Sequence, residues 1–228
     1  MRTLVSAASV LTKKASTEAI CLQEKISDFV WRFRLSLIIF RKTFTFMISF
    51  FFRTFFKLSG WSIAGRVPDH IKQCVVVAAP HTSNYDYLYS LAVFFELKMP
   101  VKFLGKKELF AFPLGLLMRA TGGIAVDRSK KNNLVDYMVG LFKEYNELFL
   151  LIPPEGTRSA VKEWKTGFYR VAQTAKVPII LGYLDYKKKE AGFGKVFYPT
   201  GDLEKDMIEI KAFYQSVTPR HPNKYREA

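Results

Sequence analysis

Short apolar runs alternate along most of the chain with longer stretches in which apolar residues recur at helical spacing. Runs of about four to eight apolar residues are typical of buried strands, and the longer periodic stretches are typical of helices that pack on one face. The runs predict strands at residues 73–80, 100–104, 123–127, 147–152, 177–184 and 194–198. The periodic stretches predict helices at residues 85–97, 112–121, 131–145, 164–175 and 203–216. This alternation predicts an α/β fold with a largely parallel sheet flanked by helices.

The first 66 residues follow a different pattern. They carry eleven Lys or Arg residues against three acids, a net charge of +8 out of the chain's +15. Between Arg41 and Lys57 a polar residue recurs at every fourth position, and phenylalanines occupy most of the other positions. The longest uncharged run, residues 43–52, is well short of the ~20 apolar residues that span a bilayer. We therefore predict a basic amphipathic helix that lies in a membrane interface, and the alternative is a core helix of a soluble protein.

These patterns divide the chain into three parts. We expect an N-terminal extension at residues 1–27, a membrane-interfacial helical segment at 28–60 and one α/β domain at 61–228. A domain of this length can bury a sizeable core without disulfides or metals. The two cysteines provide no disulfide framework, and Cys74 opens an apolar run, as expected of a buried core thiol.

Candidate chemistry begins at the end of the first strand, in the segment PHTSNYD at residues 80–86. Histidine side chains titrate near neutrality, so an imidazole that a carboxylate orients can remove a proton from an alcohol. On one helix, side chains five positions apart would point about 140° away from each other. We therefore place His81, the candidate base, in the loop and Asp86, its orienter, in the first turn of the next helix. Ser83 and Asp86 also match a helix capping box, which would explain both without catalysis.

A second segment, EGTR at residues 155–158, follows the strand predicted at 147–152. Gly156 permits a tight turn with positive φ, which directs Arg158 toward the crevice that His81 faces, beyond the carboxyl ends of the strands. The planar fork of an arginine suits a phosphate group. The alternative is a surface salt bridge between Glu155 and Arg158, worth ~0–1 kcal/mol.

Together these segments resemble the glycerolipid acyltransferase family, typified by 1-acyl-sn-glycerol-3-phosphate acyltransferase. Four family blocks are present in the family's order: H-x4-D at residues 81–86, GGIAVDR at 122–128, EGTR at 155–158 and VPIIL at 177–181. Leu181 replaces the proline that closes the fourth block in the family. A family lysine matches Lys106, with Lys107 adjacent to it. The resemblance covers about residues 60–200.

The resemblance implies transfer of a fatty acyl group from an acyl-CoA or acyl carrier protein (acyl-ACP) thioester to the hydroxyl of lysophosphatidic acid, giving phosphatidic acid. It implies a catalytic pair, His81 and Asp86, and a phosphate-binding set made of Lys106, Arg128, Glu155, Gly156, Thr157 and Arg158. It implies no covalent acyl-enzyme and no cofactor beyond the thioester, and the sequence contains no Gly-x-Ser-x-Gly motif. Because of Leu181, other acceptors stay open, such as a lyso-ornithine lipid or lysophosphatidylcholine.

Charge and composition narrow the expected partners. The three histidines, His70, His81 and His221, share no ligand-like spacing, so we expect no metal. A net charge of +15 attracts membranes and nucleic acids alike, but the densest basic and aromatic segment has a wide apolar face that suits lipid. We expect membrane lipids as partners, no nucleic acid, and a monotopic or peripheral protein on the cytoplasmic face, where thioester donors occur. A nonenzymatic basic membrane-binding module is the alternative to an enzyme.

Overall fold

The computed structural model describes residues 31–32, 34–36, 39, 43–127 and 134–225. The chain divides into two units, Met1–Met47 and Ile48–Ala228. The described residues of the first unit are helical, and the second unit contains the α/β body. The boundaries expected at residues 27 and 60 stay predictions.

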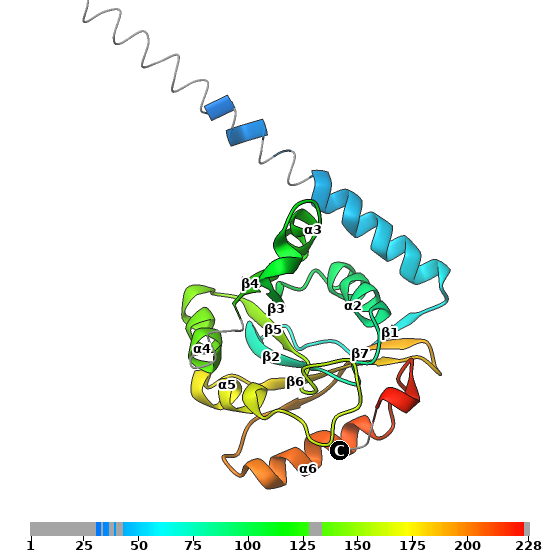
Figure 1. The fold of residues 1–228 in the computed structure, drawn as a ribbon, viewed down its shortest axis with the longest axis vertical. Coiled ribbons are helices and arrows are strands. Elements are labelled where there is room, and N and C mark those ends of the chain that lie inside the picture. The colour runs from blue at the N-terminus through cyan, green and yellow to red at the C-terminus, as the bar shows by residue number, and fades with distance from the viewer. Residues whose placement is uncertain (1–30, 33, 37–38, 40–42, 128–133, 226–228) are drawn as a thin grey trace, which may run out of the picture. The chain divides into compact units, whose positions relative to one another are not determined.

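One sheet forms the centre of the second unit (Figure 1). Within the described residues its strands are β1 (Ser62–Ala64), β2 (Gln73–Ala78), β3 (Val101–Lys106), β4 (Gly123–Val126), β5 (Leu148–Ile152), β6 (Ile179–Asp185) and β7 (Glu190–Phe197). Their order across the sheet is β1-β7-β6-β2-β5-β3-β4. All neighbouring pairs are parallel except β6 and β7. The predicted largely parallel sheet is therefore confirmed.

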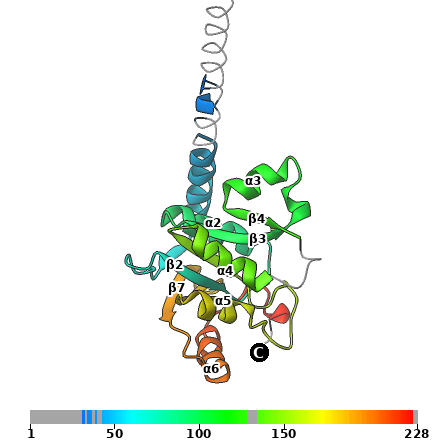
Figure 2. The same cartoon turned by 90° about the vertical axis from the view of Figure 1, so that its left-hand side faces the viewer.

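Helices cover both faces of this sheet. Besides the helix that ends at residue 58, the described helical segments are α2 (Tyr85–Glu96), η1 (Lys107–Phe110), α3 (Leu114–Ala120), α4 (Leu134–Glu144), α5 (Gly167–Ala175), α6 (Leu203–Tyr214) and η3 (Pro222–Lys224). Successive residues of a strand point to opposite faces. Val75 and Val77 of β2 share a buried cluster with α4, α5 and α6, whereas Cys74 and Val76 share one with α2. Figures 1 and 2 show α2 on the opposite side of the sheet from α4, α5 and α6. Cys74 is thus the expected core thiol, and the α/β fold class is confirmed.

Several elements differ from their predicted bounds. The sequence does not predict β1, because three residues at a sheet edge are too few to show a strand pattern. The strand predicted at 194–198 begins earlier, at Glu190, and is antiparallel to β6. The helix predicted at 112–121 begins at Leu114, after Pro113, and ends at Ala120 before Gly122, whose φ of +93° favours glycine. For the helix predicted at 131–145, the described part begins with α4.

Residues 43–58 are helical, and the part that belongs to the second unit packs beside α2. Phe52 and Phe56 are buried in the same cluster as α2, whereas Phe50 and Phe51 are exposed. The phenylalanines of this helix therefore divide between the protein core and the surface, because one side of the helix meets α2. None of the described helices is long and apolar enough to cross a membrane.

Candidate active site

Three neighbouring strands bring the candidate residues to one edge of the sheet. Strands β2, β5 and β3 are adjacent and parallel, so their carboxyl ends meet at the same edge. His81 follows β2, the EGTR segment follows β5, and Lys106 is the last residue of β3. Segments that are distant in the sequence are therefore brought together by the order of the strands.

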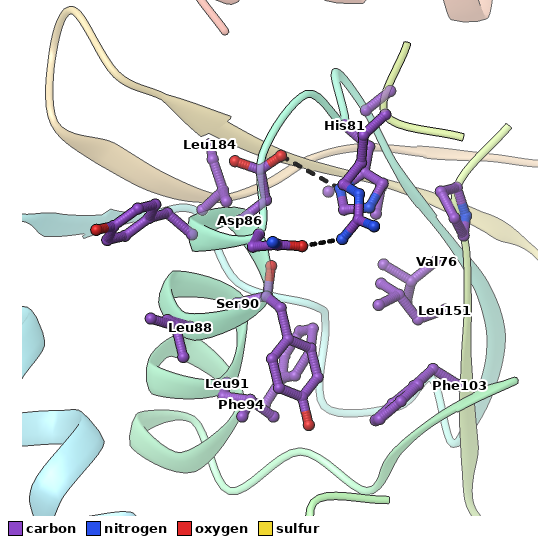
Figure 3. A pocket seen from close by; sticks show the side chains of 18 of the residues that line it. Val76, His81, Asp86, Leu88, Ser90, Leu91, Phe94, Phe103, Leu151 and Leu184 are labelled. Atoms are coloured by element: carbon purple, nitrogen blue, oxygen red, sulfur yellow. Dashed lines mark hydrogen bonds and ion pairs between the residues drawn. The ribbon is translucent and has the colours of Figure 1, made fainter. Parts of the chain in front are cut away.

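His81 and Asp86 face each other across the start of α2. The distance from His81 Nδ1 to Asp86 Oδ2 is 3.2 Å, and a dashed line in Figure 3 marks this pair. The same carboxylate oxygen accepts hydrogen bonds from the backbone amides of Thr82 (2.8 Å) and Ser83 (2.9 Å). The Asp86 side chain is only 5% exposed, whereas the His81 side chain is 26% exposed. A fixed, buried carboxylate thus holds one nitrogen of an accessible imidazole. The expected placement of His81 in the loop and of Asp86 in the first turn is confirmed.

A third side chain, Tyr186, contacts the other oxygen of this carboxylate. Its hydroxyl donates a hydrogen bond to Asp86 Oδ1 over 2.6 Å, and its backbone N–H donates to the Thr218 carbonyl. Burial by itself would raise the pKa of the Asp86 carboxyl. Hydrogen bonds from His81, Tyr186 and the Ser83 amide outweigh burial and hold that pKa below its ordinary value. Burial and then the nearby anion raise the pKa of Tyr186, so its hydroxyl stays protonated and donates.

The EGTR segment contacts the loop that carries His81. Gly156 adopts φ +65°, which confirms the expected tight turn, and a Cβ there would lie 2.8 Å from Lys165 Nζ. Arg158 Nη1 donates a hydrogen bond to Asn84 Oδ1, the second contact drawn as a dashed line in Figure 3. Because Asn84 lies between His81 and the start of α2, this bond joins the two segments directly.

Glu155 lies behind the loop that carries His81. Its carboxylate is buried, and Oε1 accepts a hydrogen bond from the His81 backbone amide over 3.0 Å. Oε2 has no hydrogen-bond partner among the described residues. Burial above all, with a contribution from the charge of Asp86, raises the pKa of Glu155. A buried carboxylate behind His81 supports the loop backbone and does not fit a phosphate-binding role, since two anions would repel each other.

His81 opens on a cavity of about 930 Å³ between α2 and the sheet. Figure 3 shows His81 and Asp86 at one end, with Val76 and Leu151 along one wall and Phe94 and Phe103 farther in. Most of the lining is apolar, and the volume lies in the upper part of the ~300–1,000 Å³ range of ligand pockets. Such an arrangement can perform proton transfer at the polar end of a molecule with a long apolar part.

Comparisons with known proteins identify the family of the chain. A family model described as Acyltransferase matches residues 46–181, more than half of the chain. The chain belongs to this acyltransferase family. Among solved structures it is similar to the 1-acyl-sn-glycerophosphate (LPA) acyltransferase PlsC from Thermotoga maritima, with a TM-score of 0.53, 18% identity and coverage of 76% of this chain and 77% of that chain. At this identity the likeness shows a shared fold. A comparison with curated proteins gives no match.

Four of the residues predicted to bind phosphate line the cavity together with His81: Lys106, Gly156, Thr157 and Arg158. Lys106 is exposed at the end of β3, so its ammonium group is free to approach a ligand. Arg128 lies outside the described residues. The binding roles of these residues, and the catalytic roles of His81 and Asp86, stay predictions.

The fourth block of the acyltransferase family forms the start of β6. Leu181, which replaces the closing proline, pairs with Val77 of β2 and is fully buried in the core. It belongs to the cluster shared with α4, α5 and α6, and the described lining of the cavity does not include it. The side chain that replaces the proline is therefore not part of the cavity wall, and nothing at this position favours a lyso-ornithine lipid or lysophosphatidylcholine.

Sequence reasoning misses the C-terminal segment that packs under the His81 loop. The His221 backbone N–H donates to Thr82 Oγ1 over 3.3 Å, and the Arg220 guanidinium lies 3.9 Å from the ring centroid of Tyr85. Sequence reasoning also misses Tyr186. Its partner Asp86 is 100 positions away, and no local pattern encodes a pairing over that distance.

Proposed function

We propose that this enzyme is an O-acyltransferase that moves a fatty acyl group from acyl-CoA or acyl-ACP to the free hydroxyl of lysophosphatidic acid, giving phosphatidic acid. The observation that carries the proposal is the His81–Asp86 pair on a largely apolar cavity whose lining also contains Arg158 and Lys106. The pair supplies a base, the apolar walls suit an acyl chain, and the two cations suit a phosphate. This reaction requires all three features in one site.

The proposed mechanism uses the second nitrogen of the His81 ring. Because Asp86 holds Nδ1, Nε2 is the atom that accepts the proton of the acceptor hydroxyl. The hydroxyl oxygen attacks the thioester carbonyl, and Asp86 stabilises the imidazolium that forms. The tetrahedral intermediate collapses with cleavage of the C–S bond, and the imidazolium returns its proton to the thiolate. The products are an ester and a free thiol, with no covalent acyl-enzyme and no cofactor beyond the thioester.

Arg158 is the proposed main contact of the acceptor phosphate. A guanidinium carries five N–H donors, and the bond from Nη1 to Asn84 leaves others for the phosphate oxygens. Lys106 and the hydroxyl of Thr157 line the same cavity and would add to the binding. A phosphate bound there fixes the acceptor hydroxyl beside His81 and gains rate through orientation.

We further propose a monotopic or peripheral protein on the cytoplasmic face of a membrane, with membrane lipids and the lysophospholipid as partners and no nucleic acid. The net charge of +8 in the first 66 residues supports attraction to anionic headgroups. The exposed Phe50 and Phe51 support contact with the acyl boundary.

The test measures thiol release from a long-chain acyl-CoA by the detergent-solubilised protein, with and without lysophosphatidic acid. His81→Ala should abolish the acceptor-dependent release. His70→Ala is the matched control, because His70 is exposed and lies before β2, at the opposite edge of the sheet from the site. The same measurement with acyl-ACP distinguishes the donors. Full activity of His81→Ala would remove His81 from the mechanism. Absence of release with both donors would direct the test to other lysolipid acceptors, and failure with all of them would favour the nonenzymatic membrane-binding module.

A further inference from the structure

Apolar side chains gather on the surface of the segment formed by η1 and α3. The exposed fractions are 86% for Phe112, 53% for Leu116, 46% for Leu114 and 40% for Leu109. A single exposed apolar residue is ordinary, but four within eight positions form a patch of the kind that marks an interaction site. We call Leu109, Phe112, Leu114 and Leu116 the rim surface.

The backbone under the rim surface is firmly held. The Arg119 guanidinium donates hydrogen bonds to the carbonyls of Phe110 and Gly115, and it also lies 5.5 Å from the centre of the Phe110 ring. A Cβ at Gly115 would lie 2.0 Å from the Phe110 carbonyl oxygen, so the two helical segments approach each other closely. Phe110 is buried beneath them, while Phe112 stands at the connection between them. Phe112 is therefore presented to the outside by a supported turn.

The rim surface is continuous with the cavity next to His81. Leu109 and Leu114 belong to the rim surface and also line the cavity. Tyr87 of α2 lines it too, and its hydroxyl lies 2.7 Å from Thr121 Oγ1, which connects α2 to the end of α3. An apolar path thus leads from the exposed side of α3 into the space between α2 and the sheet.

The chain segment that carries the rim surface is basic. Residues 106–119 contain three cations, Lys106, Lys107 and Arg119, against one acid, Glu108. Apolar side chains at the centre with Lys and Arg beside them are the composition of a surface that meets anionic lipid. Phe50, Phe51 and Leu58 of the helix at 48–58 are also exposed. Figures 1 and 2 both draw this helix and α3 above the sheet.

We propose that the rim surface enters the acyl boundary of a bilayer that contains anionic lipid, and that lipid substrate passes from the bilayer into the cavity between Leu109 and Leu114. The proposal rests on the proposed function, since it assigns to a lipid substrate the route by which it reaches His81. The partner is a lipid surface rather than a second copy of the chain, because the apolar residues lead into the cavity and are flanked by cations.

The test places an environment-sensitive fluorophore at one position of the full-length protein. Cys21→Ser removes one native thiol, and Cys74 is fully buried and does not react in the folded protein. Phe112→Cys then carries the label. Ile208→Cys is the matched control, because Ile208 is also an exposed apolar residue (71%) but lies on α6, which covers the other face of the sheet. A position-specific label is needed because the basic first 66 residues can by themselves bind the protein to vesicles.

The labelled proteins are mixed with vesicles of phosphatidylcholine and phosphatidylglycerol, with and without bromine on the acyl chains. On vesicle-bound protein the label at position 112 should shift its emission to the blue and be quenched by the brominated chains, while the label at 208 should do neither. Absence of quenching at 112 on bound protein would overturn the proposal. A blue shift at 112 without vesicles that grows with protein concentration would also overturn it, in favour of a second copy of the chain. The measurement requires no turnover, so it is independent of the thiol-release test. Quenching without thiol release would reject the proposed reaction and support the contact of the rim surface with the bilayer.

Discussion

Replacement of Tyr186 by phenylalanine tests how the carboxylate beside His81 is held. The substitution removes one hydroxyl and keeps the ring, which packs edge-on against Trp61 at 4.9 Å and Tyr89 at 5.8 Å. The partner of the hydroxyl, Asp86 Oδ1, is buried and would lose its donor. Hydrogen bonds to charged groups contribute about 1.5–3 kcal/mol. We expect the free energy of unfolding at neutral pH to fall by an amount in that range.

This loss of stability should depend on pH in a direction that Asp86 sets. The folded-state pKa of Asp86 lies below its ordinary value of 3.8, so the stabilisation from its hydrogen bonds is present above that pH. It is lost as the pH falls through the folded-state pKa. In Tyr186→Phe this pKa moves back toward the ordinary value. The difference between the two proteins, measured by urea unfolding, should be constant near neutral pH and shrink in acid.

The same hydroxyl should affect turnover, because Asp86 must hold His81 while the imidazole is charged. We expect kcat to fall about tenfold, which corresponds to about 1.4 kcal/mol, with little change in KM for the acceptor. Tyr169→Phe is the matched control, since Tyr169 donates over 2.7 Å to Asp206 in another buried pair, away from the cavity. The control should lose stability and keep its kcat. Wild-type kcat in Tyr186→Phe, with a stability loss like that of the control, would refute the positioning role.

Two further substitutions and one control test the EGTR segment. Arg158→Ala should raise the KM for lysophosphatidic acid more than it lowers kcat. The control is Asn84→Ala, which removes the hydrogen-bond partner of Arg158 but keeps the guanidinium, and it should leave that KM unchanged. Equal KM values for Arg158→Ala and wild type in acceptor titrations would disprove the phosphate contact. Glu155→Gln keeps an acceptor for the His81 amide and removes a buried charge. Because burial raises the folded-state pKa of Glu155 above 4.5, the wild type loses stability as the pH rises from 4.5 through that pKa, and the variant does not. The melting temperature of Glu155→Gln minus that of the wild type should therefore increase as the pH rises. Parallel pH profiles of the two melting temperatures would contradict this account.

The parts of the fold that could be predicted are those with a local signal. The apolar runs locate β2, β5 and β6 because central parallel strands are buried on both faces and contain few polar residues. The pairing of His81 with Asp86 could also be predicted from a local signal, since the two residues belong to one loop and the helix that follows it. Tyr186 has no such signal, because only the position of β6 next to β2 brings it to Asp86.

The pattern of apolar residues also does not predict whether an apolar side chain packs in the protein core or stays on the surface. Residues 109–118 contain enough apolar positions to resemble a core helix, yet Phe110 and Met118 are buried while Phe112 and Leu116 are exposed. Periodicity defines a face, and tertiary packing decides whether protein covers that face. Glu155 shows the same limit for a polar residue, since the family block marks its position and only the fold turns its carboxylate inward.

The segment around Ser83 admits two interpretations, a helix cap and a catalytic pair, and its contacts show that they do not exclude each other. Asp86 Oδ2 accepts the Ser83 amide, as in a capping box, and the same oxygen faces His81 Nδ1. The Ser83 hydroxyl departs from the box, because it accepts from the amide of Tyr85 rather than from that of Asp86. Rotation of the carboxylate away from the imidazole would break its bonds to the loop before α2 and leave the Thr82 and Ser83 amides unpaired in a buried site. The bonds that hold this loop therefore also restrain the side chain that orients His81.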